Sequence, residues 1–368
     1  PNAGLAGVSG SMHMVSGSAS SGDSGSFVLT TGDATQGKAG SFRLKLGQGN
    51  SGQGGHIMLE AGETTDTESG GSITAVTGYS TRTSSGSFSL TTPNAGLAGV
   101  SGSFHLTTGT SSAGDAGSMT FLTGDATQGK AGDILLQVGN GNTGPGGAIV
   151  VQAGETTDDQ AVGGAVAITA GPGTNTDGSD GGDGGSIVIT AGAARGGHEF
   201  DNGGDIVATG GEASSGSGGD IALTTGYGIA SSSGSISLQT KDSGAAGVSG
   251  DIRLRTGSST HGDSGFYALT TGDATSGKAG SITLTVGSGN SGQGGHLKIR
   301  AGETTDTESG GSITVTTGYS TQTSSGSYHL STPNAGLAGV SGKVEMLTGT
   351  ASAGDSGTFY LTTGDATQ

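Results

Sequence analysis

The chain has 368 residues, of which 82 are Gly, whereas aromatic residues make up 4% and both Cys and Trp are absent. So little bulky apolar material excludes a conventional globular core, and the absence of Cys excludes stabilisation by disulfides. The formal net charge of −17 disfavours binding to nucleic acid or to an anionic membrane, and no apolar run is long enough to span a bilayer.

A short motif recurs along the whole chain, and residues 25–32 are its clearest copy. Each copy begins with a Gly and a small or polar residue, continues with an apolar–x–apolar pair, and ends with Thr or another small residue and Gly. We call the first Gly the mark glycine; about 23 copies follow one another, mostly 15 or 16 residues apart. Alternation of this kind, bounded by Gly, predicts a half-buried β-strand in each copy.

Two apolar columns run through these copies, at the second and fourth residues after the mark glycine. The residue between them varies freely, from Val28 to Arg43 to Met58. Because successive side chains of an extended chain point to opposite sides, both columns are expected to face inward and the residue between them outward. The clearest predicted core residues are Phe27, Leu29, Phe42, Leu44, Ile57, Leu59, Phe104, Leu106, Ile187, Ile189, Ile252 and Leu254.

One strand and a return of about ten residues cannot bury an apolar face alone, whereas stacked copies can. The sequence therefore predicts an all-β protein, a parallel β-solenoid (β-helix) of about 23 coils with 15–16 residues per coil. The sequence also has a longer repeat of 240 residues that contains many short copies. For example, the phrase Gly32-Asp33-Ala34-Thr35 recurs as Gly272-Asp273-Ala274-Thr275.

In chain order, residues 1–92 form regular coils, and residues 93–154 repeat them. Residues 155–204 are predicted to be irregular coils with longer loops, and residues 205–368 return to regularity. The whole chain is expected to be one continuous solenoid segment. Since neither end looks like a cap and the chain starts at Pro1, this segment is expected to belong to a longer array.

Acidic loops are the only candidate metal sites. Asp177, Asp180 and Asp183 lie in a Gly-rich stretch that is similar to the nonapeptide of calcium-binding RTX repeats, but Ser186 stands where that motif has a ligand Asp. The phrase at residues 63–68 recurs at 303–308 and offers further carboxylates. A solvated, self-repelling turn explains these loops without a metal, so no cofactor is predicted, with Ca²⁺ as the alternative.

The pattern of reactive residues does not indicate a catalytic site. His13 and His105 are replaced by Arg253 and Glu345 at the equivalent positions 240 residues later, and no Cys or His-x-x-x-His pattern occurs. The protein is therefore predicted not to be an enzyme.

Hydroxyl groups offer sites for O-linked sugar, and the best candidates are Thr92-Pro93 and Thr332-Pro333, where Pro replaces the closing Gly.

The Gly/Ser/Thr-rich phrases at residues 84–90 and 310–315 resemble repeat-array proteins of algal and protist cell surfaces and, more loosely, bacterial repeat adhesins. This resemblance implies an extracellular, filament-forming and glycosylated structural protein. The uncapped ends predict that the main partner is another copy of the chain, stacked end to end so that it continues the β-ladder, with lateral assembly as a second mode. The alternatives are a binding module, such as an adhesin stalk or an ice- or sugar-binding rod, and a carbohydrate-active enzyme with a groove at residues 155–204.

Overall fold

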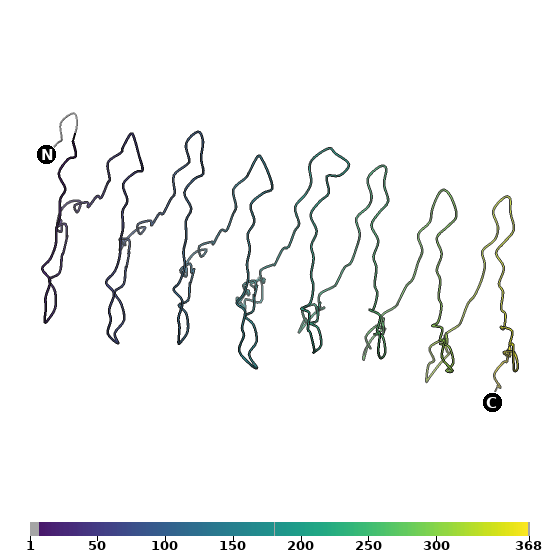
Figure 1. Ribbon diagram of the computed structural model, residues 1–368. Coiled ribbons are helices and arrows are strands. Elements are labelled where there is room, and N and C mark those ends of the chain that lie inside the picture. Colours follow the sequence, from purple (N-terminus) through teal and green to yellow (C-terminus); the bar gives the residue numbers. More distant parts are fainter. Residues whose placement is uncertain (1–6, 180, 367–368) are drawn as a thin grey trace. The chain divides into compact units, whose positions relative to one another are not determined.

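A computed structural model describes residues 7–179 and 181–366 of the chain. Neither range contains an α-helix or a β-strand, and Figure 1 accordingly shows a plain trace without coiled ribbons or arrows. The chain is coil-like and alternates between extended segments, which carry the apolar columns, and loops of Gly, Ser, Thr and Asp. It divides into two units, Pro1–Ile187 and Val188–Gln368, and this alternation continues through each of them.

The predicted parallel β-solenoid is therefore wrong for the part of the chain that the structure describes. A solenoid needs backbone hydrogen bonds between the segments of successive copies. The backbone hydrogen bonds found in residues 7–179 and 181–366 instead close single loops, as where Gly71 N–H donates to the Gly62 carbonyl at 2.8 Å. The alternation of apolar residues thus reflects the extended conformation of each segment, and not pairing between segments.

The described residues also form no core. None of their side chains is buried, and the chain exposes 37127 Å² of accessible surface. A folded monomer of this mass exposes about 13,000 Å², and a fully unfolded chain about 50,000 Å². Most of the apolar surface therefore remains in contact with water.

Each loop is closed by a neck, which we define as the mark glycine together with the two residues that end the preceding copy. At the neck of residues 62–71, a Cβ added to Gly71 would lie 3.2 Å from the nitrogen of Gly62 and 3.4 Å from the Cβ of Ala61. At the neck of residues 46–55, a Cβ on Gly55 would lie 3.4 Å from Leu46 Cδ1. The close approach of the two ends of the loop therefore favours Gly at the tight necks, such as Gly71 and Gly147. At Gly25 and Gly117 an added Cβ would lie 3.6 Å and 3.8 Å from its nearest neighbour, which is ordinary contact.

The second unit uses the same necks. Gly204, Gly219, Gly234, Gly311 and Gly326 each donate their N–H group to the Gly that closes the preceding copy, at 2.8–3.1 Å. The longer return at residues 192–204 is closed in the same way as the short return at residues 211–219. An insertion therefore lengthens the loop without changing the neck.

Some necks are closed by a side chain instead of the backbone. Thr332 Oγ1 donates to the carbonyl of Gly342 at 3.0 Å, and Thr31 and Thr271 make longer contacts with Gly40 and Gly280, at 3.4 Å. Thr31 and Thr271 are 240 residues apart. The long sequence period is therefore accompanied by a repeat of the local structure.

Candidate functional site

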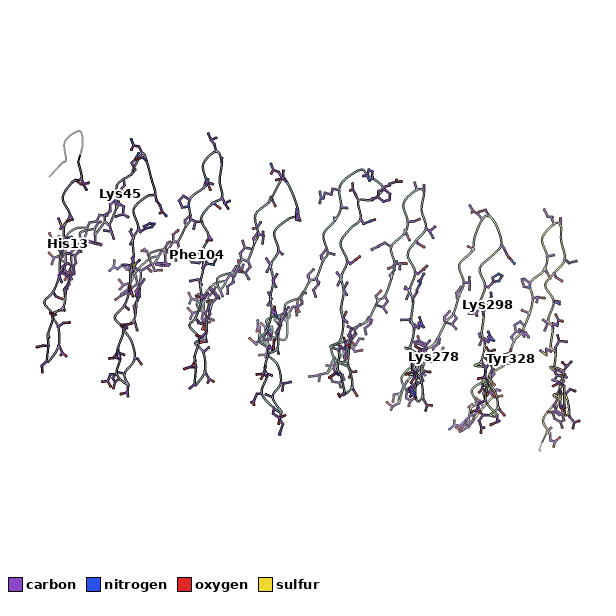
Figure 2. All side chains as sticks on the ribbon, in the orientation of Figure 1. His13, Lys45, Phe104, Lys278, Lys298 and Tyr328 are labelled. Carbon is purple, nitrogen blue, oxygen red and sulfur yellow. The ribbon has the colours of Figure 1, made fainter. Side chains whose placement is uncertain are left out.

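The two apolar columns are the most extensive candidate surface. In the copy at residues 187–189, the exposed fraction is 51% for Ile187, 81% for Val188 and 70% for Ile189. In this copy the two column residues are thus less exposed than the residue between them, although all three remain exposed. Figure 2 shows Phe104 on one such segment. All twelve predicted core residues are exposed in the chain: Phe27, Leu29, Phe42, Leu44, Ile57, Leu59, Phe104, Leu106, Ile187, Ile189, Ile252 and Leu254.

Two of the calcium candidates, Asp177 and Asp183, lie in the loop closed by Gly171 and Gly185. Asp177 N–H donates to Asn175 Oδ1 at 3.0 Å, and Asp177 Oδ1 accepts hydrogen bonds from Ser179 N–H at 3.0 Å and Ser179 Oγ at 2.8 Å. The backbone hydrogen bond from Ser179, followed by the side-chain hydrogen bond, lowers the pKa of Asp177. The carboxylate of Asp177 is therefore already engaged by its own loop.

Asp180 lies outside the described residues, and Asp183 is exposed. No three His, Cys, Asp or Glu residues come together to hold a metal ion within residues 7–179 and 181–366. The structure therefore does not assemble Asp177 and Asp183 with a third ligand. A calcium site at these residues stays a prediction.

The acidic loops at residues 63–68 and 303–308 have the same local hydrogen bonds. Asp66 N–H donates to Thr64 Oγ1 at 3.2 Å, and Asp66 Oδ1 accepts from Thr67 N–H at 2.7 Å. The equivalent bonds of Asp306 measure 3.1 Å and 2.6 Å. These local turns account for the Thr and Asp positions of the phrase without a bound ion.

The structure gives the proposed glycosylation residue Thr332 a further role. Its hydroxyl closes a neck, and its Cγ2 would lie 3.3 Å from a Cβ on Gly342. Thr92 is the equivalent residue of the neck at Gly102, where the same separation is 3.5 Å. Pro93 and Pro333 follow them as exposed residues. A sugar on Thr332 Oγ1 would remove the proton that it donates to Gly342, so glycosylation there and closure of the neck exclude one another.

Sequence reasoning missed the role of the sixth residue after each mark glycine. This position holds mostly Thr, Ala or Val, which is a visible signal, and in the structure it packs against the next mark glycine. The sequence pattern identifies Thr at this position only as the small residue that ends each copy. Its contact with a Gly nine or ten residues later could have been inferred only from the loop geometry.

The loop closed by Gly192 and Gly204 is ordered by His198 and Asp201. His198 N–H donates to Asp201 Oδ2 and Asp201 N–H donates to the His198 carbonyl, both at 3.0 Å. The rings of His198 and Phe200 are 5.3 Å apart, centroid to centroid. The described part of the chain encloses no cavity at this loop or elsewhere.

Comparisons of the chain with protein-family models, curated proteins and solved structures give no match. Among the residues that the structure describes, no helix has the length and apolar character needed to cross a membrane. The candidate surfaces therefore have to be interpreted from their own chemistry.

Proposed function

We propose that this chain is a non-catalytic structural protein that associates with further copies of itself into an extracellular filament through its two apolar columns. One observation carries the proposal: the columns recur in every copy, and no described side chain in them is buried. Apolar surface that is kept at fixed positions and left in water is typical of an interface.

The magnitude of the exposed surface supports association. The chain exposes roughly 24,000 Å² more than a folded monomer of its mass, whereas a standard protein interface buries only about 1,600 Å². Burial of one Ile or Leu side chain contributes about 1.5–3 kcal/mol. Even partial coverage of the columns by another chain would therefore stabilise an assembly.

The regular spacing supports a filament over a closed oligomer. Because the copies are 15 or 16 residues apart over most of the chain, the columns of one chain match those of another at many offsets. An interface that repeats by translation does not close on itself, so further chains can always be added. The extracellular location and attached sugars follow from the resemblance to cell-surface repeat arrays.

The experiment that tests this function is a concentration series of the 368-residue chain. Sedimentation velocity would measure the mass, and negative-stain electron microscopy would show the form of the particles. We expect filaments above a critical concentration, together with hydrogen-exchange protection of the columns that is absent below it. A chain that stays monomeric at the highest attainable concentration would overturn the proposal.

A further inference from the structure

Charge is divided unevenly between the extended segments and the rest of the chain. The six residues after each mark glycine carry seven Lys or Arg and six Asp or Glu in total. All other residues together carry six Lys or Arg and 24 Asp or Glu. The segments are therefore nearly neutral, with a net charge of +1 (7 − 6), and hold more than half of the basic residues, whereas the rest of the chain has a net charge of −18 (6 − 24).

Three segments carry two basic residues each, separated by one apolar residue, and we call these pairs basic rungs. They are Arg43/Lys45, Arg253/Arg255 and Lys298/Arg300. Residues two apart on an extended chain lie on the same side, about 7 Å from each other. Figure 2 shows the side chains of Lys45 and Lys298 projecting from the trace.

The basic rungs are only partly neutralised within the chain. Arg300 forms an ion pair with Glu303 at 2.7 Å, and both side chains are about 80% exposed. Arg253 pairs with Asp251 at 2.6 Å. In residues 7–179 and 181–366 the ion pairs do not include Lys298, Arg255 or either member of the Arg43/Lys45 rung. An exposed pair such as Arg300–Glu303 exchanges readily for another carboxylate.

The geometry points to the acidic loops of a neighbouring copy of this chain as the partner of the basic rungs. Each of the loops 63–68 and 303–308 presents three carboxylates, and the local turn fixes Asp66 and Asp306 in the same way in both. A two-cation rung complements such a loop in charge. This inference rests on the proposed function and adds to it a lateral contact that depends on salt.

The chain contains its own control for this contact. At the positions equivalent to Lys298 and Arg300, 240 residues earlier, it carries Met58 and Glu60, beside an identical acidic loop. The double substitution K298M/R300E therefore installs a sequence that the same segment already has elsewhere. The apolar columns and the neck are unchanged, so the substitution removes the rung together with the exposed Arg300–Glu303 ion pair.

The test measures association by light scattering as a function of NaCl concentration. Between about 0.01 M and 1 M salt the screening length falls from about 30 Å to 3 Å. We expect the critical concentration for association of the natural chain to rise several-fold as salt is added. At low salt the critical concentration of K298M/R300E should be higher than that of the natural chain, and it should depend less on salt. Association that is insensitive to salt would overturn the lateral contact but leave the proposed function intact, whereas no association at any salt would overturn the function itself.

A charge exchange between two variants identifies the partner. K298E/R300E has an acidic rung, and E303K/E308K has a basic loop. Each alone should associate more weakly than the natural chain at low salt, and their mixture should recover association. If the mixture does not recover, the inference is overturned. Heparin that then binds the natural chain but not K298M/R300E would identify an acidic polysaccharide as the partner of the rung.

Discussion

The loops and the extended segments of this chain differ in where their structure comes from. Loops are closed by hydrogen bonds between residues that are close in sequence, such as Gly86 N–H to the Gly78 carbonyl at 2.8 Å. In the described ranges, the apolar segments make no such bonds to one another. Loop conformation is therefore encoded locally, whereas the columns of the described segments are left exposed.

Two loops 240 residues apart show that loop conformation is determined by nearby residues. Ser80 Oγ accepts hydrogen bonds from Arg82 N–H and Thr83 N–H at 3.2 Å and 3.0 Å. Ser320 does the same for Gln322 and Thr323, at 3.2 Å and 2.9 Å. The replacement of Arg82 by Gln322 leaves the turn unchanged, because only its backbone N–H takes part.

Substitution in the columns is expected to have the largest effect. I187D/I189D places two carboxylates where association would bury two apolar side chains, each worth about 1.5–3 kcal/mol. Since about 1.4 kcal/mol corresponds to a tenfold change in an equilibrium constant, the critical concentration for assembly should rise more than tenfold. The matched control is V188D, in the outward position between them. Equal effects of I187D/I189D and V188D in sedimentation would contradict a role for the columns.

A methyl group at the tightest neck is expected to have the next largest effect. A Cβ on Gly210 would overlap the carbonyl oxygen of Gly219, whereas a Cβ on Gly211 meets nothing within 4 Å. G210A should therefore destabilise the closed loop by about 1–3 kcal/mol, as overpacking does. G211A should be neutral or stabilising by up to about 1 kcal/mol, because it restricts only the open chain.

Amide hydrogen exchange in residues 212–218 measures the opening of this loop directly. Faster exchange in G210A than in G211A is the expected result. Similar rates in the two variants would mean that the neck does not hold the loop closed.

This contrast also explains what the sequence could predict. The period, the extended segments and the loops follow from Gly, Thr and Asp at fixed spacings, and the structure has all three. Pairing between segments could not be inferred from the sequence, because alternation as in Ile57-Met58-Leu59 requires only an extended backbone. The neck contact of Thr332 was missed because it depends on how the intervening loop folds.

Removal of one neck hydroxyl should have a smaller effect. T332V keeps the shape of the side chain but deletes the hydrogen bond from Oγ1 to the Gly342 carbonyl. Because this bond is exposed, the expected cost is at the low end of the usual range, about 0.5 kcal/mol. Exchange of the amide protons in the loop that follows Thr332 should quicken by roughly twofold.

Thr317 supplies the control for this substitution. It packs against Gly326 in the same way, but its neck is closed by the backbone bond from Gly326 N–H to the Gly318 carbonyl at 2.8 Å. T317V should therefore leave exchange in its loop unchanged. An equal response of the two loops would show that the hydroxyl of Thr332 is not what closes its neck.

The smallest expected effect is at Asp177, where the loop stabilises one charged side chain. Hydrogen bonds from the Ser179 backbone and hydroxyl lower the pKa of Asp177 below the ordinary value of about 3.9. A lowered pKa in the folded loop means that the stabilisation is present above the ordinary pKa and is lost as the pH falls through the lowered one. S179A removes the hydroxyl bond but keeps the backbone bond, so the pKa should rise part of the way back. Carboxyl chemical shifts followed by NMR through the acid range would measure it, and an unchanged midpoint would mean that the hydroxyl does not stabilise the carboxylate.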